Sequence, residues 1–80
     1  MGQRSMISLD DIAVGSTARV QDVEGVDPTA VRLLEMGLTP GVAVRVVGQA
    51  PFGDPVELEF RGYRLSIRRH EAARVVVENR

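Results

Sequence analysis

The spacing of the apolar residues changes at Gly41, and this change constrains the fold of the chain more than any other feature. Before it, apolar side chains within residues 28–38 recur at intervals of three and four, which is typical of a helix. After it, every second residue is apolar along two successive stretches, which are Val42, Val44 and Val46, then Val56, Leu58 and Phe60. Alternation of this kind predicts strands with one buried face. The sequence therefore predicts a helix followed by a run of short strands.

Short strands make up most of the predicted structure, and the helix follows the first of them. The predicted strands span residues 17–23, 42–47, 56–60, 63–67 and 74–78. A parallel sheet would need repeated crossover connections, which a short chain with one helix lacks. The expected fold class is therefore mainly β, a small antiparallel β-barrel of about five strands with one inserted α-helix and short helical turns. Closure of the barrel would remove exposed strand edges.

The helix has clear start and stop signals. Asp27 is placed to cap it, and Pro28 occupies its first turn, where a missing N–H does no harm. Gly37 is placed for a left-handed C-terminal cap. Pro40 and Gly41 then predict a sharp turn into the next strand.

A helical wheel of the predicted helix, residues 28–36, separates an inward face from an outward face. The residues expected on the core-facing side are Val31, Leu34 and Leu38, with Ala30 at its edge. The residues expected on the outward side are Arg32 and Met36, with Leu33 on its flank.

Two shorter helical turns are predicted outside this helix. Ser8 and Asp11 have the spacing of a capping box, with Leu9 and Ile12 as anchors on the core. The second turn spans residues 69–73, before the last strand.

Composition excludes several kinds of chemistry. The 80 residues allow one domain, and they include no cysteine and no lysine. Disulfides, thiolate ligands, lysine Schiff bases and lysine-dependent phosphate loops are therefore excluded. No apolar run approaches the ~20 residues of a membrane span. We expect residues 1–7 to form a disordered tail, residues 8–80 to form the domain, and the protein to act in the cytoplasm.

The sequence offers no set of residues suited to catalysis or metal binding. His70 is the only histidine, and it lies next to Glu71 in a predicted surface turn. A general base at this position is conceivable, but no serine or cysteine nucleophile can be assigned to it. One histidine and scattered carboxylates do not form a tight transition-metal site. We expect no enzymatic activity, no cofactor and no metal site.

Nucleic-acid binding is the main alternative, because small β-barrels often bind nucleic acids. Five arginines gather in the C-terminal third, namely Arg61, Arg64, Arg68, Arg69 and Arg74. Acidic residues interleave with them, namely Glu57, Glu59, Glu71 and Glu78, and the net charge is −1. Phe60 and Tyr63 occupy inward positions of their strands, which would leave them unavailable for stacking on bases. We expect no specific binding of DNA or RNA.

Two apolar residues are difficult to place in the core. Phe52 lies in a predicted hairpin loop, and Met36 lies on the outward side of the helix. Exposed apolar groups that form a patch usually mark an interface. The residues expected to contact a protein partner are Arg32, Leu33, Met36, Phe52, Gly53 and Asp54. The alternative is local packing, with Phe52 folded over the barrel mouth and Met36 on the N-terminal turn.

The stretch from Arg32 to Gly41, Arg-Leu-Leu-Glu-Met-Gly-Leu-Thr-Pro-Gly, resembles the FeoA family of ferrous-iron transport proteins. Other parts of the chain fit in order. They are an early Leu-x-x-Ile-x-x-Gly at residues 9–15, the loop Pro-Phe-Gly-Asp-Pro at 51–55 and a closing segment at 61–77. The resemblance covers residues 8–78.

This resemblance implies an SH3-like barrel without catalytic residues, which acts in the cytoplasm beside the membrane permease FeoB and contacts its GTP-binding region. The protein would reach the membrane only through this partner. The same domain is attached to iron-dependent repressors of the DtxR type, and the lack of a helix-turn-helix segment here favours the free-standing form. A metal-dependent repressor's accessory domain and a nucleic-acid-binding barrel remain alternatives. The oligomeric state stays open, because an uncapped edge strand could form a weak homo-oligomer.

Overall fold

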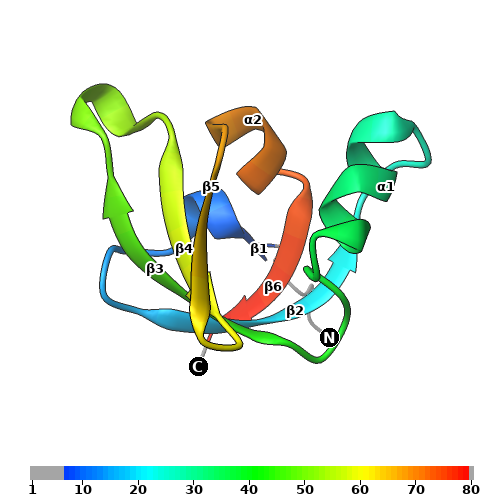
Figure 1. Ribbon diagram of the computed structural model, residues 1–80, viewed down its shortest axis with the longest axis horizontal. Helices are drawn as coiled ribbons and strands as arrows, with labels where there is room; N and C mark the ends of the chain where they lie inside the picture. Colours follow the sequence, from blue (N-terminus) through cyan, green and yellow to red (C-terminus); the bar gives the residue numbers. More distant parts are fainter. Residues whose placement is uncertain (1–6, 80) are drawn as a thin grey trace, which may run out of the picture.

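Six antiparallel strands form one sheet in the computed structural model, which describes residues 7–79 (Figure 1). The strands are β1 (Ile7–Ser8), β2 (Thr17–Val23), β3 (Ala43–Gln49), β4 (Val56–Phe60), β5 (Tyr63–Ile67) and β6 (Val75–Asn79). The helices are the 3-10 turn η1 (Leu9–Asp11), α1 (Pro28–Glu35), the 3-10 turn η2 (Pro51–Gly53) and α2 (Arg69–Ala72). The mainly β architecture with one inserted helix is confirmed.

The strand order is β1-β6-β2-β3-β4-β5, so β4 lies between β3 and β5 as the sequence predicts. The pairings leave the sheet open, with β1 and β5 at its two ends. The expectation that closure removes the exposed edges is therefore wrong for the described part of the chain. The sequence also missed β1, because a strand of two residues is too short to show alternation.

Residue 7 of the predicted disordered tail belongs to β1, where it pairs with Val77 of β6. Residues 1–6 of that tail lie outside the described residues. Directly after β1, the predicted capping box is present. The Ser8 N–H donates to Asp11 Oδ2 at 2.9 Å, and the Asp10 N–H donates to the Ser8 hydroxyl oxygen at 3.2 Å.

Most strand faces follow the predicted alternation. The buried side chains on β2, β3, β4 and β5 include Ala18, Val20, Val44, Val46, Val56, Leu58, Phe60 and Ile67. Tyr63 is an exception, because it was predicted to point inward and is 51% exposed. Its ring lies beside Phe60, with ring centroids 5.3 Å apart. It is half covered because β5 is the last strand of the sheet and has a neighbour on one side only.

The predicted ends of α1 are confirmed. Asp27 Oδ1 accepts a hydrogen bond from the Ala30 N–H at 3.2 Å, and Pro28 is the first helical residue. Gly37 adopts φ +109°, and the N–H of Leu38 donates to the Leu33 carbonyl at 3.2 Å. This is a left-handed C-terminal cap of the Schellman type, and it ends the helix at Glu35. The turn at Pro40 and Gly41 then leads into β3, closed by a bond from the Val42 N–H to the Thr39 carbonyl at 3.1 Å.

The predicted core-facing side of α1 is right for Leu38, which is fully buried, but wrong for Val31 and Leu34. Ala30 and Leu33 are fully buried, whereas Val31 is 46% exposed and Leu34 is 38% exposed. Gly37 explains the orientation, because a Cβ atom there would lie 3.0 Å from Cε2 of Phe60. The helix therefore approaches the sheet through its smallest residues. A helical wheel ranks positions by hydrophobicity, so it favours Val31 and Leu34 as the buried side. It takes no account of the close contact between helix and sheet that small residues allow.

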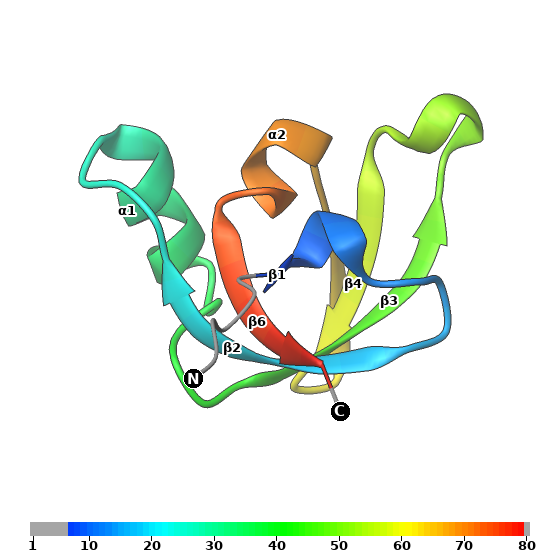
Figure 2. The same ribbon diagram turned by 180° about the vertical axis from the view of Figure 1, so that it is seen from behind.

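Both helices and the β3–β4 loop gather at one end of the molecule. In Figure 1, α2 lies between α1 on one side and the loop that contains η2 on the other. Figure 2 shows the same order from behind. Among residues 7–79, no helix is long and apolar enough to cross a membrane.

Candidate functional site

The tip of the β3–β4 loop presents one large apolar side chain to solvent. Phe52 is 100% exposed, which excludes the alternative that it folds over the sheet. Its backbone adopts φ +74°, a left-handed conformation that residues with a Cβ atom rarely adopt. A fully exposed aromatic side chain on a strained backbone does not stabilise the fold. Phe52 is therefore a candidate for contact with a partner.

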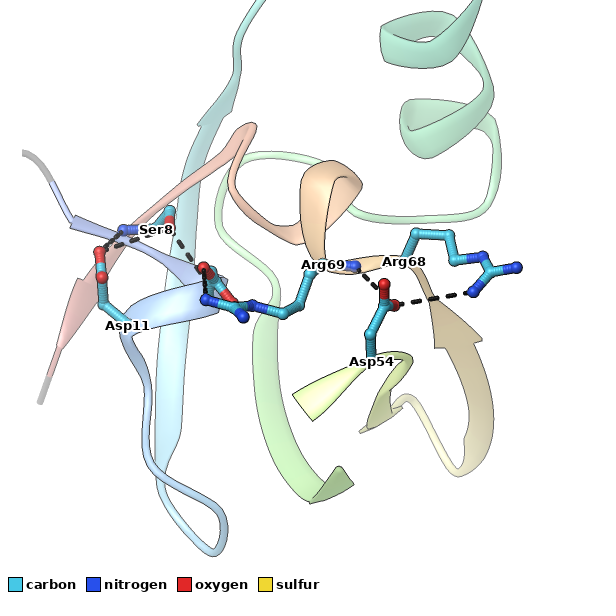
Figure 3. Close-up of polar contacts among 6 residues, drawn as sticks. Ser8, Asp11, Asp54, Arg68 and Arg69 are labelled. Atoms are coloured by element: carbon cyan, nitrogen blue, oxygen red, sulfur yellow. Dashed lines mark hydrogen bonds and ion pairs between the residues drawn. The ribbon is translucent and has the colours of Figure 1, made fainter. Parts of the chain in front are cut away.

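Hydrogen bonds hold the base of this loop. The Gly53 N–H donates to the Ala50 carbonyl at 2.7 Å, and the Ala50 N–H donates to the Pro55 carbonyl at 3.1 Å. Asp54 Oδ1 accepts a hydrogen bond from the Arg69 N–H at 3.1 Å (Figure 3). Phe52 therefore stands on a loop whose two ends are tied together and to α2.

The N-terminal end of α2 joins two other segments. Arg69 donates from Nε and Nη2 to the two carboxylate oxygens of Asp10, at 3.0 and 3.3 Å. These hydrogen bonds raise the pKa of the Arg69 guanidinium above its ordinary value. Arg68, the residue before α2, lies 3.9 Å from Asp54 through Nη1 and Oδ1 (Figure 3). The segment thus links η1 to the β3–β4 loop.

Glu71 links α2 to α1. Its side chain is almost completely buried, and Oε1 accepts a hydrogen bond from the Arg68 N–H at 2.8 Å. Its other oxygen forms an ion pair with Arg32 of α1. The sequence predicts Glu71 in a surface turn, and this prediction is wrong for its side chain. A buried carboxylate needs both a counter-charge and hydrogen bonds, and it has both here.

The structure divides the predicted contact residues into two groups on either side of α2. Phe52, Gly53 and Asp54 lie on the loop, whereas Arg32, Leu33 and Met36 lie on α1 or at its end. Leu33 cannot contact a partner, because it is fully buried. Met36 is half-buried and packs against the core, so its predicted position on the opposite side of the helix is also wrong.

The sequence predicted Leu33 as the apolar residue of α1 that contacts a partner, but Val31 and Leu34 are the exposed ones. They form the exposed apolar side of α1, and Arg32 stands between them in the sequence with its guanidinium on Glu71. The missed signal is the pair of small residues, Ala30 and Gly37, which mark the side of a helix that can approach a sheet closely.

The loop between β2 and α1 is held by an arginine whose role the sequence did not indicate. Arg74 donates from Nη1 to Asp27 Oδ2 at 3.0 Å and from Nη2 to the Glu24 carbonyl at 3.1 Å. Gly25 leaves room for it, because a Cβ atom there would overlap the Arg74 guanidinium. The hydrogen bond from Arg74 is the main cause that lowers the pKa of Asp27. The cap of α1 is thus tied to the strand β6 that follows α2.

Catalytic and metal-ligand sets are not assembled in the described part of the chain. His70 is exposed on α2, and its neighbour Glu71 is engaged by Arg32 and the Arg68 N–H. Within residues 7–79, no group of three His, Asp or Glu side chains is placed to hold a metal ion.

Known proteins resemble the chain over nearly all of its length. The family model described as FeoA domain matches residues 7–79. The Fe(2+) transport protein A/Fe(2+) transporter FeoB fusion protein of Porphyromonas gingivalis is 39% identical over 70 residues. The matched region is 88% of this chain but 8% of that protein, so the chain spans a small part of the relative's length.

Two solved structures share the fold. The FeoA-like protein from Clostridium acetobutylicum is 31% identical, with a TM-score of 0.87 over 96% of this chain and 90% of that one. The zinc complex of Stenotrophomonas maltophilia FeoA, described as a prokaryotic SH3 domain protein, is 33% identical. Its TM-score is 0.80 over 90% of this chain and 89% of that one. The predicted SH3-like fold is confirmed.

Proposed function

The chain belongs to the FeoA family, which takes part in ferrous-iron transport, and we propose that it acts there as a non-enzymatic accessory protein in the cytoplasm. Its partner would be the cytoplasmic, GTP-binding part of a FeoB-type iron permease. The observation that carries this proposal is the fusion of the two proteins in one relative, because fused domains are held at high effective concentration. Ferrous iron is then the cargo of the partner, and the chain reaches the membrane only through it.

The docking surface that we propose has two parts on either side of α2. The loop supplies Phe52 as the central anchor, with Gly53 and Asp54 beside it. A single large aromatic group in a partner pocket can supply much of a binding free energy. Helix α1 supplies the exposed apolar pair Val31 and Leu34, which corrects the sequence-based choice of Leu33.

Met36 and Arg32 stand at the margin of the helical part of this surface. Met36 is half-buried, and methionine adapts well to an irregular partner surface. Arg32 is more than half exposed although it pairs with Glu71, so it can also reach a carboxylate of the partner.

The test is the binding of the Phe52→Ala variant to the cytoplasmic domain of a FeoB-type permease. Loss of a true anchor costs about 2 kcal/mol or more, so binding should weaken by about 30-fold or more. Folding stability should change by less than about 0.5 kcal/mol, because the side chain is fully exposed.

The matched control is Val14→Ala, which removes an exposed apolar side chain from the loop between η1 and β2. It should bind as well as the unaltered chain. Equal binding by Phe52→Ala and Val14→Ala would place the interface elsewhere, and failure of the unaltered chain to bind would contradict the proposed partner.

One observation, the exposure of Tyr63, supports the alternative function of nucleic-acid binding. Tyr63 is half exposed on β5 next to Arg64, so the expectation that its ring is unavailable for stacking does not hold. Against this, four of the five arginines in the C-terminal third pair with carboxylates, namely Arg64, Arg68, Arg69 and Arg74. We expect titration with labelled oligonucleotides to give no sub-micromolar binding, and a steep salt dependence of tight binding would reverse the ranking.

A further inference from the structure

The outer edge of β5 carries backbone groups that have no hydrogen-bond partner among the described residues. β5 is the end strand of the sheet, and it pairs only with β4. A two-residue turn, Arg61–Gly62, joins the two strands and places Phe60 opposite Tyr63. In such a hairpin the residues that flank the turn bond to each other, and every second pair along the strands does the same.

This alternation decides which groups of β5 point outward. Tyr63, Leu65 and Ile67 direct their N–H and C=O groups toward β4. Arg64 and Ser66 direct theirs away from the sheet. No backbone or side-chain group of residues 7–79 bonds to these four groups.

The usual protections of an edge strand are weak here. The β4–β5 pairing runs through five residue pairs without a bulge, and β5 contains neither proline nor glycine. The opposite end of the sheet differs, because β1 is only two residues long. The β5 edge is therefore a regular template for a further strand.

A shallow open hollow of about 220 Å³ lies along this edge, lined by Glu57, Arg64, Leu65 and Ser66. Glu57 of β4 is directly opposite Ser66 of β5. The Glu57 carboxylate leans toward Gly48 of β3, where its Oε1 would lie 3.0 Å from a Cβ atom added to that glycine, and the small Ser66 leaves the hollow open on the side of β5. The hollow thus offers an acidic group and free backbone groups to a strand that lies beside it.

We propose that β5 pairs antiparallel with β5 of a second copy of this chain, around a two-fold axis at Leu65. Arg64 then lies opposite Ser66 of the second copy, and the two residues exchange both backbone hydrogen bonds. The two-fold axis repeats this pair, so all four free groups are satisfied. Leu65 meets Leu65, and Tyr63 lies beside Ile67 of the second copy, which would cover its exposed ring.

Charge complementarity favours a second copy over an unrelated strand. In this register the Arg64 guanidinium of one copy extends over Ser66 of the other toward Glu57. Within its own chain, Arg64 lies 3.7 Å from Glu59 through Nε and Oε2, so each arginine would stand between two carboxylates. Within residues 63–67 no two residues of like charge are directly opposite, an arrangement that would destabilise the pairing, although the two Arg64 side chains are diagonal neighbours across the axis. An unrelated strand would need an arginine opposite Ser66 and a small residue opposite Arg64. A second copy of this chain has both.

Amide hydrogen exchange of the unaltered chain tests the proposal directly. Protection of the Arg64 and Ser66 amides should rise as the protein concentration increases. The amides of Tyr63, Leu65 and Ile67 should be protected at all concentrations, because they bond to β4. A monomer up to about millimolar concentration, or no change at Arg64 and Ser66, would overturn the proposal.

Two variants test the register by sedimentation. Ser66→Pro removes the outward N–H, which the sheet itself does not use, so the fold should persist while self-association weakens by about tenfold or more. Ser66→Ala keeps the N–H and should associate like the unaltered chain. If Ser66→Pro associates as well as Ser66→Ala, the register is wrong.

A charge exchange tests the contact between Arg64 and Glu57. Arg64→Glu should weaken association, and the double variant Arg64→Glu with Glu57→Arg should restore it. Arg19→Glu, an equal charge change on β2, which is three strands away from β5, is the control and should leave association unchanged. If the unaltered chain stays monomeric while Ser66→Pro loses binding to the permease domain, the edge receives a strand of that partner instead, and self-pairing is overturned.

Discussion

Helix α1 and the β3–β4 loop lie on either side of α2, and each exposes large apolar side chains in a different setting. On α1, Val31 and Leu34 adjoin the fully buried Leu33, so their exposure follows from a helix whose other side is part of the core. On the loop, Phe52 stands apart from the core with its backbone at φ +74°. Partial exposure beside a core has a structural explanation. The full exposure of Phe52, combined with its backbone strain, has no such structural explanation, so it is stronger evidence for a functional role.

The first prediction concerns the two adjacent leucines of α1. Leu33→Ala should lower the free energy of unfolding by about 2–5 kcal/mol, because it leaves a cavity under the helix. Leu34→Ala is the matched control and should cost less than about 1 kcal/mol, since its side chain is already partly in water. Urea unfolding of both variants gives the two values. Equal costs would contradict the orientation of α1 described above.

The second prediction concerns the close approach of α1 to the sheet. Gly37→Ala should cost about 1–2 kcal/mol for its left-handed backbone and up to about 3 kcal/mol more for crowding Phe60. Gly15→Ala has a similar φ of +95° and nothing within 4 Å of its added Cβ atom, so it should cost the backbone part alone. A Gly37→Ala variant as stable as Gly15→Ala would mean that the helix can move away from Phe60 without loss.

Strand faces and helix ends could be predicted from the sequence because local chemistry decides both. Val44, Val46 and Leu58 alternate with polar residues, and the sheet buries one side of them. As helix caps, Asp27 and Gly37 form hydrogen bonds with residues three positions away, so their capping roles are visible in the sequence.

The orientation of α1 and the polar links could not be predicted, because they depend on residues far apart in the sequence. Which apolar stripe of the helix is buried depends on Phe60, and Phe60 is 23 positions from Gly37. Likewise, the sequence predicts Glu71 in a surface turn, and only the folded chain brings Arg32 beside it. The exposure of Phe52 was one of two alternatives that the sequence left open, because proline and glycine around it indicate a loop but do not decide whether the ring folds over the sheet.

The third prediction concerns backbone strain at the tip of the loop. Phe52→Gly and Phe52→Ala both remove the exposed ring, but only glycine is unstrained at φ +74°. The glycine variant should therefore be more stable than the alanine variant by about 0.5–1 kcal/mol, as measured by thermal unfolding. An alanine variant that is equally stable would mean that the loop relaxes once the ring is absent, which would weaken the inference drawn from strain.

The smallest effect expected is a pH dependence at the start of α1. The hydrogen bond from Arg74, followed by that from the Ala30 N–H, lowers the pKa of Asp27 in the folded protein. A carboxyl group whose pKa is lower in the folded state binds protons more readily when unfolded. Its contribution to stability is therefore present above its ordinary pKa of about 4 and is lost as the pH falls through its folded pKa.

The Asp27→Asn variant isolates this contribution, because asparagine can still cap the helix but cannot titrate or pair with Arg74 as a charge. At neutral pH the variant should unfold at a lower temperature than the unaltered chain, and the difference should shrink below about pH 4. Added salt should also reduce it, since the pair is exposed to solvent. Asp22→Asn, on the exposed side of β2, is the control with the same charge change. If Asp22→Asn shows the same dependence on pH, the effect reflects net charge rather than the link between Arg74 and the helix cap.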